Sequence, residues 1–333
     1  MKKLLFIFTT FIALTNVNGQ SEHEMRYDDK IRIREAINIA NEFGEKIWKE
    51  INDVPFVLIL VTDSVEFLIN HPYPSDDFTL SGTDSILKTE IYYRAKQFNK
   101  HFLATFPAVN GVNCIVVGTP ENTVKHSTDW TITLLHEHFH QYQYSYPDYF
   151  TGVNNLGLSG GDQTGMWQLN YPFPYDNSII TEQYKKYSSA LSKTLAVIET
   201  DEFEEYFTKY ISERNKLKQL LKPADYSYFS FQIWQEGIAR YTEYKFLELL
   251  SNHKPSEELS QLSDFVAFDK YKDDFYKSKI SLLNQQSIEN DKRICFYEIG
   301  FAEGLLLDKL NPEWRDNYLT DKFYIENYSS KFR

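Results

Sequence analysis

Cysteine is nearly missing from this 333-residue sequence, which contains only Cys114 and Cys295. Two cysteines cannot form a disulfide scaffold, and they leave open either one disulfide or two buried thiols. Glycine is scarce at 13 residues, and no GxxxxGK phosphate-binding loop occurs. The sequence therefore excludes both a disulfide-stapled small domain and a P-loop nucleotide-binding protein.

Positive charge is also in short supply, with 35 Lys and Arg against 47 Asp and Glu and a net charge of −12. Such a chain repels phosphate backbones, so we expect no nucleic-acid partner. A content of 42% hydrophobic and 25% charged residues is typical of a globular protein. Aromatic residues make up 16% of the chain and supply apolar area for a core.

Long hydrophobic runs are confined to the N-terminus, where two lysines precede an apolar stretch from Leu4 to Leu14. With small residues ending at Gly19, this pattern is typical of a secretory signal peptide over residues 1–19. The run is shorter than the about 20 residues of a membrane span, although an uncleaved anchor is the alternative. We expect a secreted or periplasmic protein without stable membrane insertion after cleavage, with a mature net charge of about −14 because residues 1–19 carry two lysines and no acid.

Hydrophobic spacing divides the rest of the chain into an α+β subdomain, residues 20–125, and a mainly helical subdomain, residues 126–333. The first part is predicted to hold a small, mostly antiparallel sheet. No linker or repeat separates the two parts, so we expect one functional unit overall. The expected elements of the first part are helices over 28–51 and 85–101 and strands over 55–63, 65–71, 102–107 and 113–120. Those of the second part are helices over 127–145, 179–199, 202–221, 227–251 and 296–310, with a long irregular connection over 148–178.

The motif that carries chemistry is HExxH, formed by residues 136–140 within an expected helix. Residues four apart share a helical face, so His136 and His140 can offer two imidazoles to one metal ion. Glu137 is offset by one position and can act as general base on a metal-bound water. His138 lies on another face and is expected to have a supporting role. The alternative is a polar helix face that carries three histidines by chance.

A third ligand must come from elsewhere, because catalytic zinc usually takes three protein donors and keeps one position open. The pattern Trp-x-Glu-Gly-x-Ala-x-Tyr over residues 234–241 resembles the third-ligand helix of the gluzincin metallopeptidases, above all the alanyl-aminopeptidase type. The resemblance implies that Glu236 binds the metal and that the small residues after it pack this helix closely on the histidine helix. It also implies that Glu243 orients a ligand histidine.

A third segment, residues 296–302, resembles the Tyr-Glu-Lys-Gly-x-Ala helix start of the same aminopeptidases. The resemblance implies that Tyr297 stabilises the oxyanion of the tetrahedral intermediate. A phenol suits this task because it donates a hydrogen bond while it stays neutral at pH 7. Glu236 and Tyr297 are 61 residues apart, close to the separation in that family.

Two departures limit the resemblance. Glu236 follows His140 by 96 residues, far more than in the aminopeptidases, and Gln235 replaces the usual asparagine. The Gly-x-Met-Glu-Asn motif that recognises a substrate amine is absent. The resemblance therefore implies a small secreted bacterial relative with a thermolysin-like fold and a zinc site between its subdomains, without aminopeptidase specificity. It also implies that an edge strand, 102–107 or 113–120, binds extended substrate; an ordinary core strand is the alternative for each.

Together these motifs predict a secreted zinc metallopeptidase, either endo- or exo-acting, with one Zn²⁺ per chain and a peptide or protein as substrate. A catalytically inactive gluzincin-like binding or surface protein is the main alternative, and a structural zinc site is another. The aromatic stretch 166–175 is expected to flank the cleft, the alternative being a packed loop distant from the site.

Overall fold

The computed structural model describes residues 24–332, so the expected signal peptide lies outside the described residues. The fold is α+β, as predicted, with one six-stranded mixed sheet of order β3-β4-β2-β1-β6-β5. Its neighbouring strands are antiparallel except for β1 and β6, which are parallel. The strands are β1 (Leu58–Val61), β2 (Val65–Ile69), β3 (Thr79–Asp84), β4 (Thr89–Ala95), β5 (Leu103–Val109) and β6 (Val112–Gly118).

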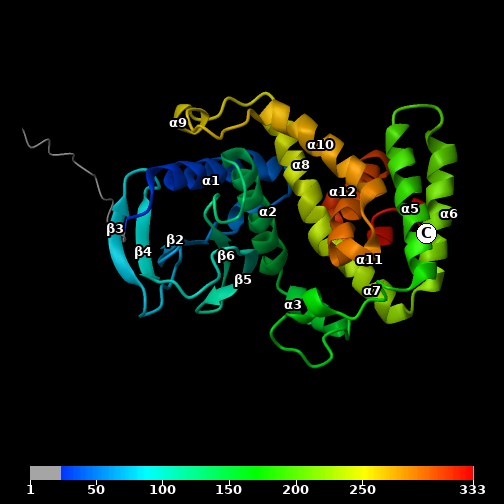
Figure 1. Ribbon diagram of the computed structural model, residues 1–333, viewed down its shortest axis with the longest axis horizontal. Helices are drawn as coiled ribbons and strands as arrows, with labels where there is room; N and C mark the ends of the chain where they lie inside the picture. The colour runs from blue at the N-terminus through cyan, green and yellow to red at the C-terminus, as the bar shows by residue number, and fades with distance from the viewer. Residues whose placement is uncertain (1–23, 333) are drawn as a thin grey trace, which may run out of the picture.

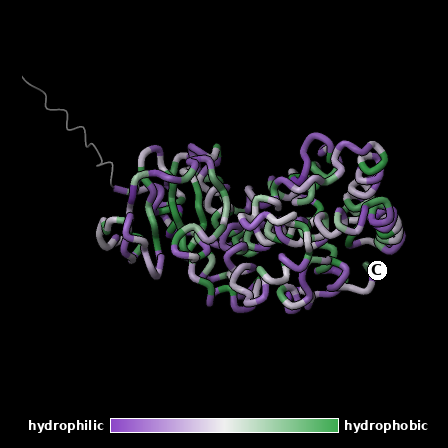
Figure 2. Tube along the Cα trace, turned by 90° about the horizontal axis from the view of Figure 1, so that it is seen from below, coloured by the Kyte–Doolittle hydropathy of each residue, from purple (hydrophilic) through white to green (hydrophobic). Residues whose placement is uncertain are grey.

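Both faces of the central strands are covered, which explains their continuous apolar sequence. Leu58 and Leu60 on β1 belong to the large core shared with the helices. Their neighbours Ile59 and Val61 point the other way, into a smaller cluster on the opposite face. This alternation is the two-residue period of a strand. The central strands of the sheet are correspondingly green in Figure 2.

The predicted helix over 85–101 is wrong. Residues 89–95 form β4, which pairs with β2 on one side and with β3 on the other. The segment is rich in residues that favour strands, such as Ile91, Tyr92 and Tyr93. Lys88 has a φ of 56° at the turn that joins β3 to β4. Pairing on both edges satisfies the backbone of β4, and a helix here would leave the edge of β2 unpaired.

The helices occupy most of the chain after residue 126. Figure 1 shows the sheet at one end of the long axis and the α5–α6 hairpin at the other, with α2 and α8 between them. The helices are α1 (Tyr27–Ile47), α2 (Ser127–Ser145), α3 (Tyr149–Asn155), α4 (Trp167–Asn170), α5 (Ser178–Ala196), α6 (Phe203–Leu220), α7 (Pro223–Gln232), α8 (Ile238–Leu250), α9 (Glu257–Ser260), α10 (Phe268–Gln285), α11 (Ile288–Asp291) and α12 (Cys295–Leu310).

Several helices differ in extent from the sequence prediction. The stretch 148–178 is less irregular than expected, since it contains α3 and α4, and α10 arises where the sequence analysis assigned no element. Cys114 and Cys295 are both buried free thiols, which decides between the two alternatives for them. Among residues 24–332, no helix is both long and apolar enough to cross a membrane.

One π-helical turn, η2 (Ile233–Gly237), interrupts the helical run between α7 and α8. Its hydrogen bond runs from the backbone N–H of Ile238 to the carbonyl of Ile233. Such π-turns are rare and occur often at functional sites. Glu236 lies within this turn, so the turn sets the direction of its side chain.

A contact between two glycines joins this turn to α12. A Cβ atom added to Gly237 would lie 2.4 Å from the Cα of Gly300, and the reverse holds for Gly300. Helix α8, which follows Glu236, packs on the histidine helix α2 as expected, but Gly237 itself makes its closest contact with α12. The close approach is possible because neither residue carries a side chain. It places the turn that holds Glu236 directly against α12, the helix that holds Tyr297.

Candidate metal centre

Helix α2 carries His136 and His140 one turn apart on a buried face, as their spacing predicted. The two Nε2 atoms are 3.2 Å from each other. Helix α2 begins after His126, whose side chain accepts a hydrogen bond from the backbone N–H of Asp129. The helix packs between the sheet on one side and α8 on the other, and both histidines are buried. The burial holds their rings in fixed orientations.

Glu236 completes a group of three donors that could hold a metal ion. Its Oε2 lies 3.7 Å from Nε2 of His136 and 3.4 Å from Nε2 of His140. Two ligand atoms bound tetrahedrally at about 2.1 Å from one zinc ion are about 3.4 Å apart. The three distances between donor atoms, 3.2, 3.4 and 3.7 Å, therefore fit the edges of one coordination tetrahedron. The donor set fits such an ion, since two histidines and a glutamate are a common ligand set of catalytic zinc.

Each histidine has a side-chain oxygen close to its Nδ1 atom. Nδ1 of His136 lies 2.6 Å from Oε1 of Glu243, and Nδ1 of His140 lies 2.7 Å from Oε1 of Gln143 and 3.2 Å from Nε2 of Gln235. When Nδ1 carries the proton, the lone pair of Nε2 is available to a metal. Gln143 is itself oriented, because its Nε2 donates to the carbonyl of Gln235 at 3.0 Å. The sequence analysis missed Gln143, although its spacing of three residues from His140 places it on the same helical face.

The Glu243 carboxylate is fixed in turn by Arg240. Nη1 of Arg240 lies 2.8 and 3.0 Å from the two carboxylate oxygens of Glu243. Burial by itself raises the pKa of Glu243, but the guanidinium and His136 outweigh it and lower the pKa to about 2. Glu243 is therefore an anion at neutral pH, and it lies where the resemblance places a carboxylate that orients a ligand histidine.

The electrostatics of the group favour a cation between the histidines and Glu236. Burial alone lowers the pKa of His136, but the carboxylates of Glu236 and Glu243 outweigh it and raise the pKa to about 9. Burial would raise the pKa of Glu236, yet His140, His136 and Arg293 hold it well below its ordinary value. A carboxylate facing one imidazole and a second carboxylate behind it stabilise positive charge at this point.

Glu137 follows His136 on α2 and is held by strand β5. The Thr105 hydroxyl lies 2.8 Å from Oε2 of Glu137 and 2.9 Å from its backbone carbonyl oxygen. Both residues are buried. Fixing one carboxylate oxygen leaves the other to accept a proton from a water or substrate. Nothing local in the sequence marks Thr105, because the contact joins residues 32 positions apart.

Tyr297 stands in the first turn of α12, beside His136. The two rings are nearly parallel, with centroids 6.4 Å apart and an interplanar angle of 6°. The phenol oxygen accepts a hydrogen bond of 2.8 Å from Nη1 of Arg293, a residue that the sequence analysis missed. Burial and the Glu236 carboxylate raise the pKa of Tyr297 well above its ordinary value, so the phenol keeps its proton at neutral pH.

His138 lies outside the candidate metal group. Its ring stacks on Phe56 with centroids 4.7 Å apart, and its Nδ1 lies 2.9 Å from Oε1 of Gln141. Burial lowers its pKa to about 4, so the ring is neutral at physiological pH. Its position agrees with the expectation that this histidine supports the helix and does not bind the metal.

Residues 166–175 pack against the elements that lead into the site. Tyr171 stacks on Tyr228 of α7 at 4.3 Å, and Phe173 meets Phe296 of α12 edge-on at 5.4 Å. Helix α7 continues into the turn that holds Glu236, and Phe296 directly precedes Tyr297. The segment thus supports the two elements that present Glu236 and Tyr297.

Of the two strands considered for substrate pairing, only β5 has an edge without a neighbour among the described strands. Strand β6 pairs with β1 on one side and with β5 on the other, so it is an interior strand. Strand β5 pairs with β6 alone and carries Thr105, which contacts Glu137. Edge strand β5 therefore contacts Glu137, the residue next to the candidate ligand His136.

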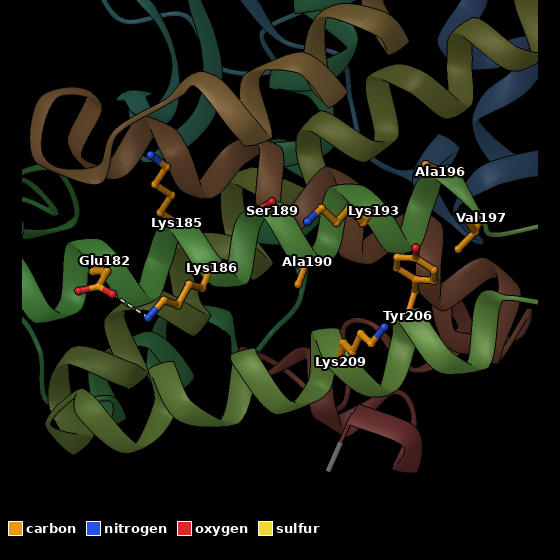
Figure 3. A pocket seen from close by; sticks show the side chains of 10 residues that line it. All are labelled: Glu182, Lys185, Lys186, Ser189, Ala190, Lys193, Ala196, Val197, Tyr206 and Lys209. Carbon is orange, nitrogen blue, oxygen red and sulfur yellow. Dashed lines mark ion pairs between the residues drawn. The ribbon is translucent and has the colours of Figure 1, made fainter.

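A separate groove of about 750 Å³ runs along α5 and the start of α6 (Figure 3). Lysines line much of it, and Lys186 pairs with Glu182 at 2.7 Å. None of the candidate metal ligands lines this groove.

Comparison of the chain with protein-family models, with curated proteins and with solved structures gives no match.

Proposed function

We propose that this chain is a zinc-dependent metallopeptidase of the gluzincin type, exported to the periplasm or the medium. The observation that carries the proposal is the convergence of His136, His140 and Glu236 at distances that suit one tetrahedral ion. Glu137 lies next to the first ligand in the sequence, where a general base is needed. Three protein donors leave one position open, which is typical of a catalytic site and atypical of a structural one.

The chain's own residues take distinct roles in the proposed reaction. A bound zinc ion supplies Lewis acidity, which polarises the scissile carbonyl and activates water. Glu137 accepts the proton of the attacking water and passes it to the leaving amine. Tyr297 donates a hydrogen bond to the carbonyl oxygen as negative charge develops on it. Glu243 and Gln143 keep the ligand histidines oriented throughout.

The free edge of β5 offers a place for an extended peptide. Unpaired backbone groups of an edge strand can pair with a substrate main chain. Because Thr105 on this strand holds Glu137, a peptide paired along β5 would run close to the general base. This arrangement favours a peptide over a small-molecule substrate.

The first test measures zinc per chain in mature protein purified without added metal or chelator. We expect one zinc ion per chain, and its loss when His136 and His140 are both replaced by alanine. His126→Asn is the matched control, because asparagine retains the helix cap and His126 is outside the metal group. Absence of zinc, with no uptake of added Zn²⁺, would overturn the proposal.

Activity is tested on a peptide library with the zinc-loaded protein and two variants. Glu137→Gln should keep zinc and lose turnover, because the amide cannot accept the proton. Glu236→Ala should lose zinc affinity, since only two donors remain. Full activity in Glu137→Gln would refute its role as base. A zinc-loaded wild type that cleaves no peptide would instead identify a binding protein built on this site.

A further inference from the structure

Arg293 lies at the candidate metal centre without being one of its ligands. It belongs to η3 (Lys292–Ile294), the short 3-10 turn that leads into α12. Its Nη1 donates to the Tyr297 phenol oxygen at 2.8 Å and lies 3.8 Å from Oε1 of Glu236. The guanidinium therefore lies close both to Tyr297, the proposed hydrogen-bond donor to the oxyanion, and to Glu236, the proposed third metal ligand.

The donor and acceptor roles in this contact follow from chemistry. A guanidinium has only donors, so the phenol oxygen must be the acceptor. The phenol's own proton is then directed elsewhere. It can point away from Arg293, toward the candidate metal group, where His136 lies beside the tyrosine ring. Arg293 thus determines where the one donor of Tyr297 is aimed.

Two other neighbours contact the tyrosine ring. His136 stacks parallel to the ring, and the Arg240 guanidinium lies 5.6 Å from its centroid. Arg240 is itself fixed by Glu243. These neighbours restrict the ring plane, whereas Arg293 donates a hydrogen bond to the phenol oxygen.

We propose that Arg293 is a positioning residue: by donating to the Tyr297 oxygen, it directs the phenol proton to the substrate carbonyl oxygen at the metal. This inference rests on the proposed peptidase function. Arg293 acts through Tyr297, and its permanent charge strengthens the phenol as a donor, because an oxygen that accepts a charge-assisted hydrogen bond becomes a better donor.

A double-mutant cycle on turnover of a cleaved peptide tests the coupling. We expect Arg293→Gln to lower kcat about tenfold to a hundredfold with little change in KM, as loss of an oxyanion donor does. In the Tyr297→Phe background the same replacement should change kcat less than about threefold, because the hydroxyl it positions is gone. Equal effects in both backgrounds would overturn the proposal and indicate direct contact of Arg293 with substrate.

A binding readout makes the test independent of peptidase activity. Acetohydroxamate is added to Co²⁺-substituted protein, and its dissociation constant is followed by visible absorption. We expect Tyr297→Phe and Arg293→Gln each to weaken binding about tenfold, with no further loss in the double variant. Lys292→Gln is the matched control: it removes a positive charge at the adjacent residue, whose partner is Asp176, and should leave binding unchanged.

Failure of the proposed function is distinguishable from failure of this inference. If the protein binds no metal or cleaves no peptide, the proposed peptidase function is refuted. The positioning of the Tyr297 hydroxyl by Arg293 can still be tested by crystal structures. Neutron diffraction from crystals of the metal-free proteins locates the phenol proton. A different O–H direction in Arg293→Gln than in wild type supports the positioning role, and an unchanged O–H direction overturns it.

Discussion

Thr105 on the edge strand β5 holds Glu137 on helix α2, with its hydroxyl 2.8 Å from Oε2 of the carboxylate. The same hydroxyl lies 2.9 Å from the backbone carbonyl oxygen of Glu137. The sheet thus fixes both the side chain and the main chain of the proposed general base. A base that is held in place loses less entropy when it meets the reacting water.

Replacing Thr105 by valine tests this contact. The shape stays similar and the donor is lost, so we expect kcat to fall about tenfold, the equivalent of one hydrogen bond of about 1.4 kcal/mol. Zinc content should not change, because Thr105 is outside the metal group. Thr105→Ser retains the hydroxyl and should retain most activity. An active valine variant would show that Glu137 needs no support from β5.

Removing the negative charge behind His136 should weaken metal binding. We expect Glu243→Gln to lower zinc affinity about tenfold to a hundredfold, because a neutral amide accepts the Nδ1 proton less strongly. Competition with a chelator of known affinity measures the change. Glu248→Gln on the same helix is the control, since Glu248 pairs with Lys245 instead. Equal affinities in the Glu243 variant and the wild type would contradict the role of Glu243.

A methyl group at Gly300 should disturb the fold and the metal site together. Its Cβ would lie 2.4 Å from the Cα of Gly237 and 2.6 Å from the Ile233 carbonyl oxygen. Both are backbone atoms, so the π-turn must move, and we expect Gly300→Ala to destabilise the protein by about 3 kcal/mol or more. Thermal unfolding and zinc titration measure the two effects.

Gly152→Ala is the comparison for that variant. Its Cβ would meet the ring of Phe323 at 3.1 Å, and a side chain can shift where a backbone cannot. We expect a loss below about 1 kcal/mol and unchanged zinc affinity. Similar losses of stability and of zinc affinity in both variants would argue against a special role for the Gly237–Gly300 contact.

Glu326 should make stability depend on pH in the acid range. Its carboxylate contacts Arg214 at 2.8 Å and the Tyr226 hydroxyl at 2.6 Å. Burial would raise its pKa, but Arg214 and Tyr226 outweigh it and lower the pKa from 4.5 to about 2. The stabilisation is present above pH 4.5 and is lost as the pH falls toward 2, and it amounts to about 3 kcal/mol.

Denaturant unfolding between pH 2 and 6 checks that effect. Glu326→Gln should lower stability at pH 6 and flatten the decline below pH 4.5, because the amide does not titrate. Glu205→Gln is the control, since Glu205 pairs with Lys209 on an exposed helix surface. An unchanged decline in Glu326→Gln would assign the acid sensitivity to other carboxylates.

Much of the fold and of the candidate site follows from local patterns. The four-residue spacing of His136 and His140 needs only a helix to bring both rings to one face, and the helix is there. Strands are predicted over 102–107 and 113–120, and the structure has β5 and β6 there, joined by Asn110 and Gly111, which both have positive φ. In both cases the determining interactions lie within a few residues.

The structure differs from the sequence-based expectations where segments far away in the sequence determine the local structure. Residues 89–95 form a strand because β2 and β3 pair with them, although the local sequence over 85–101 predicts a helix. Gly237 makes its closest contact with α12, where Gly300 also lacks a side chain. Neither partner is visible in the local pattern.

The sequence alone determined which side chains can donate to a metal. Histidine and glutamate side chains in helical spacing keep this chemistry wherever their helix lies in the fold. The tertiary structure decided how these groups meet. It brought Glu236 across 96 residues to the two histidines and set Thr105 against Glu137 and Arg293 against Tyr297. The physical reason is that distances of a few ångströms between the donor atoms depend on the packing of whole helices and strands. Here a π-turn and a contact between two glycines set that packing.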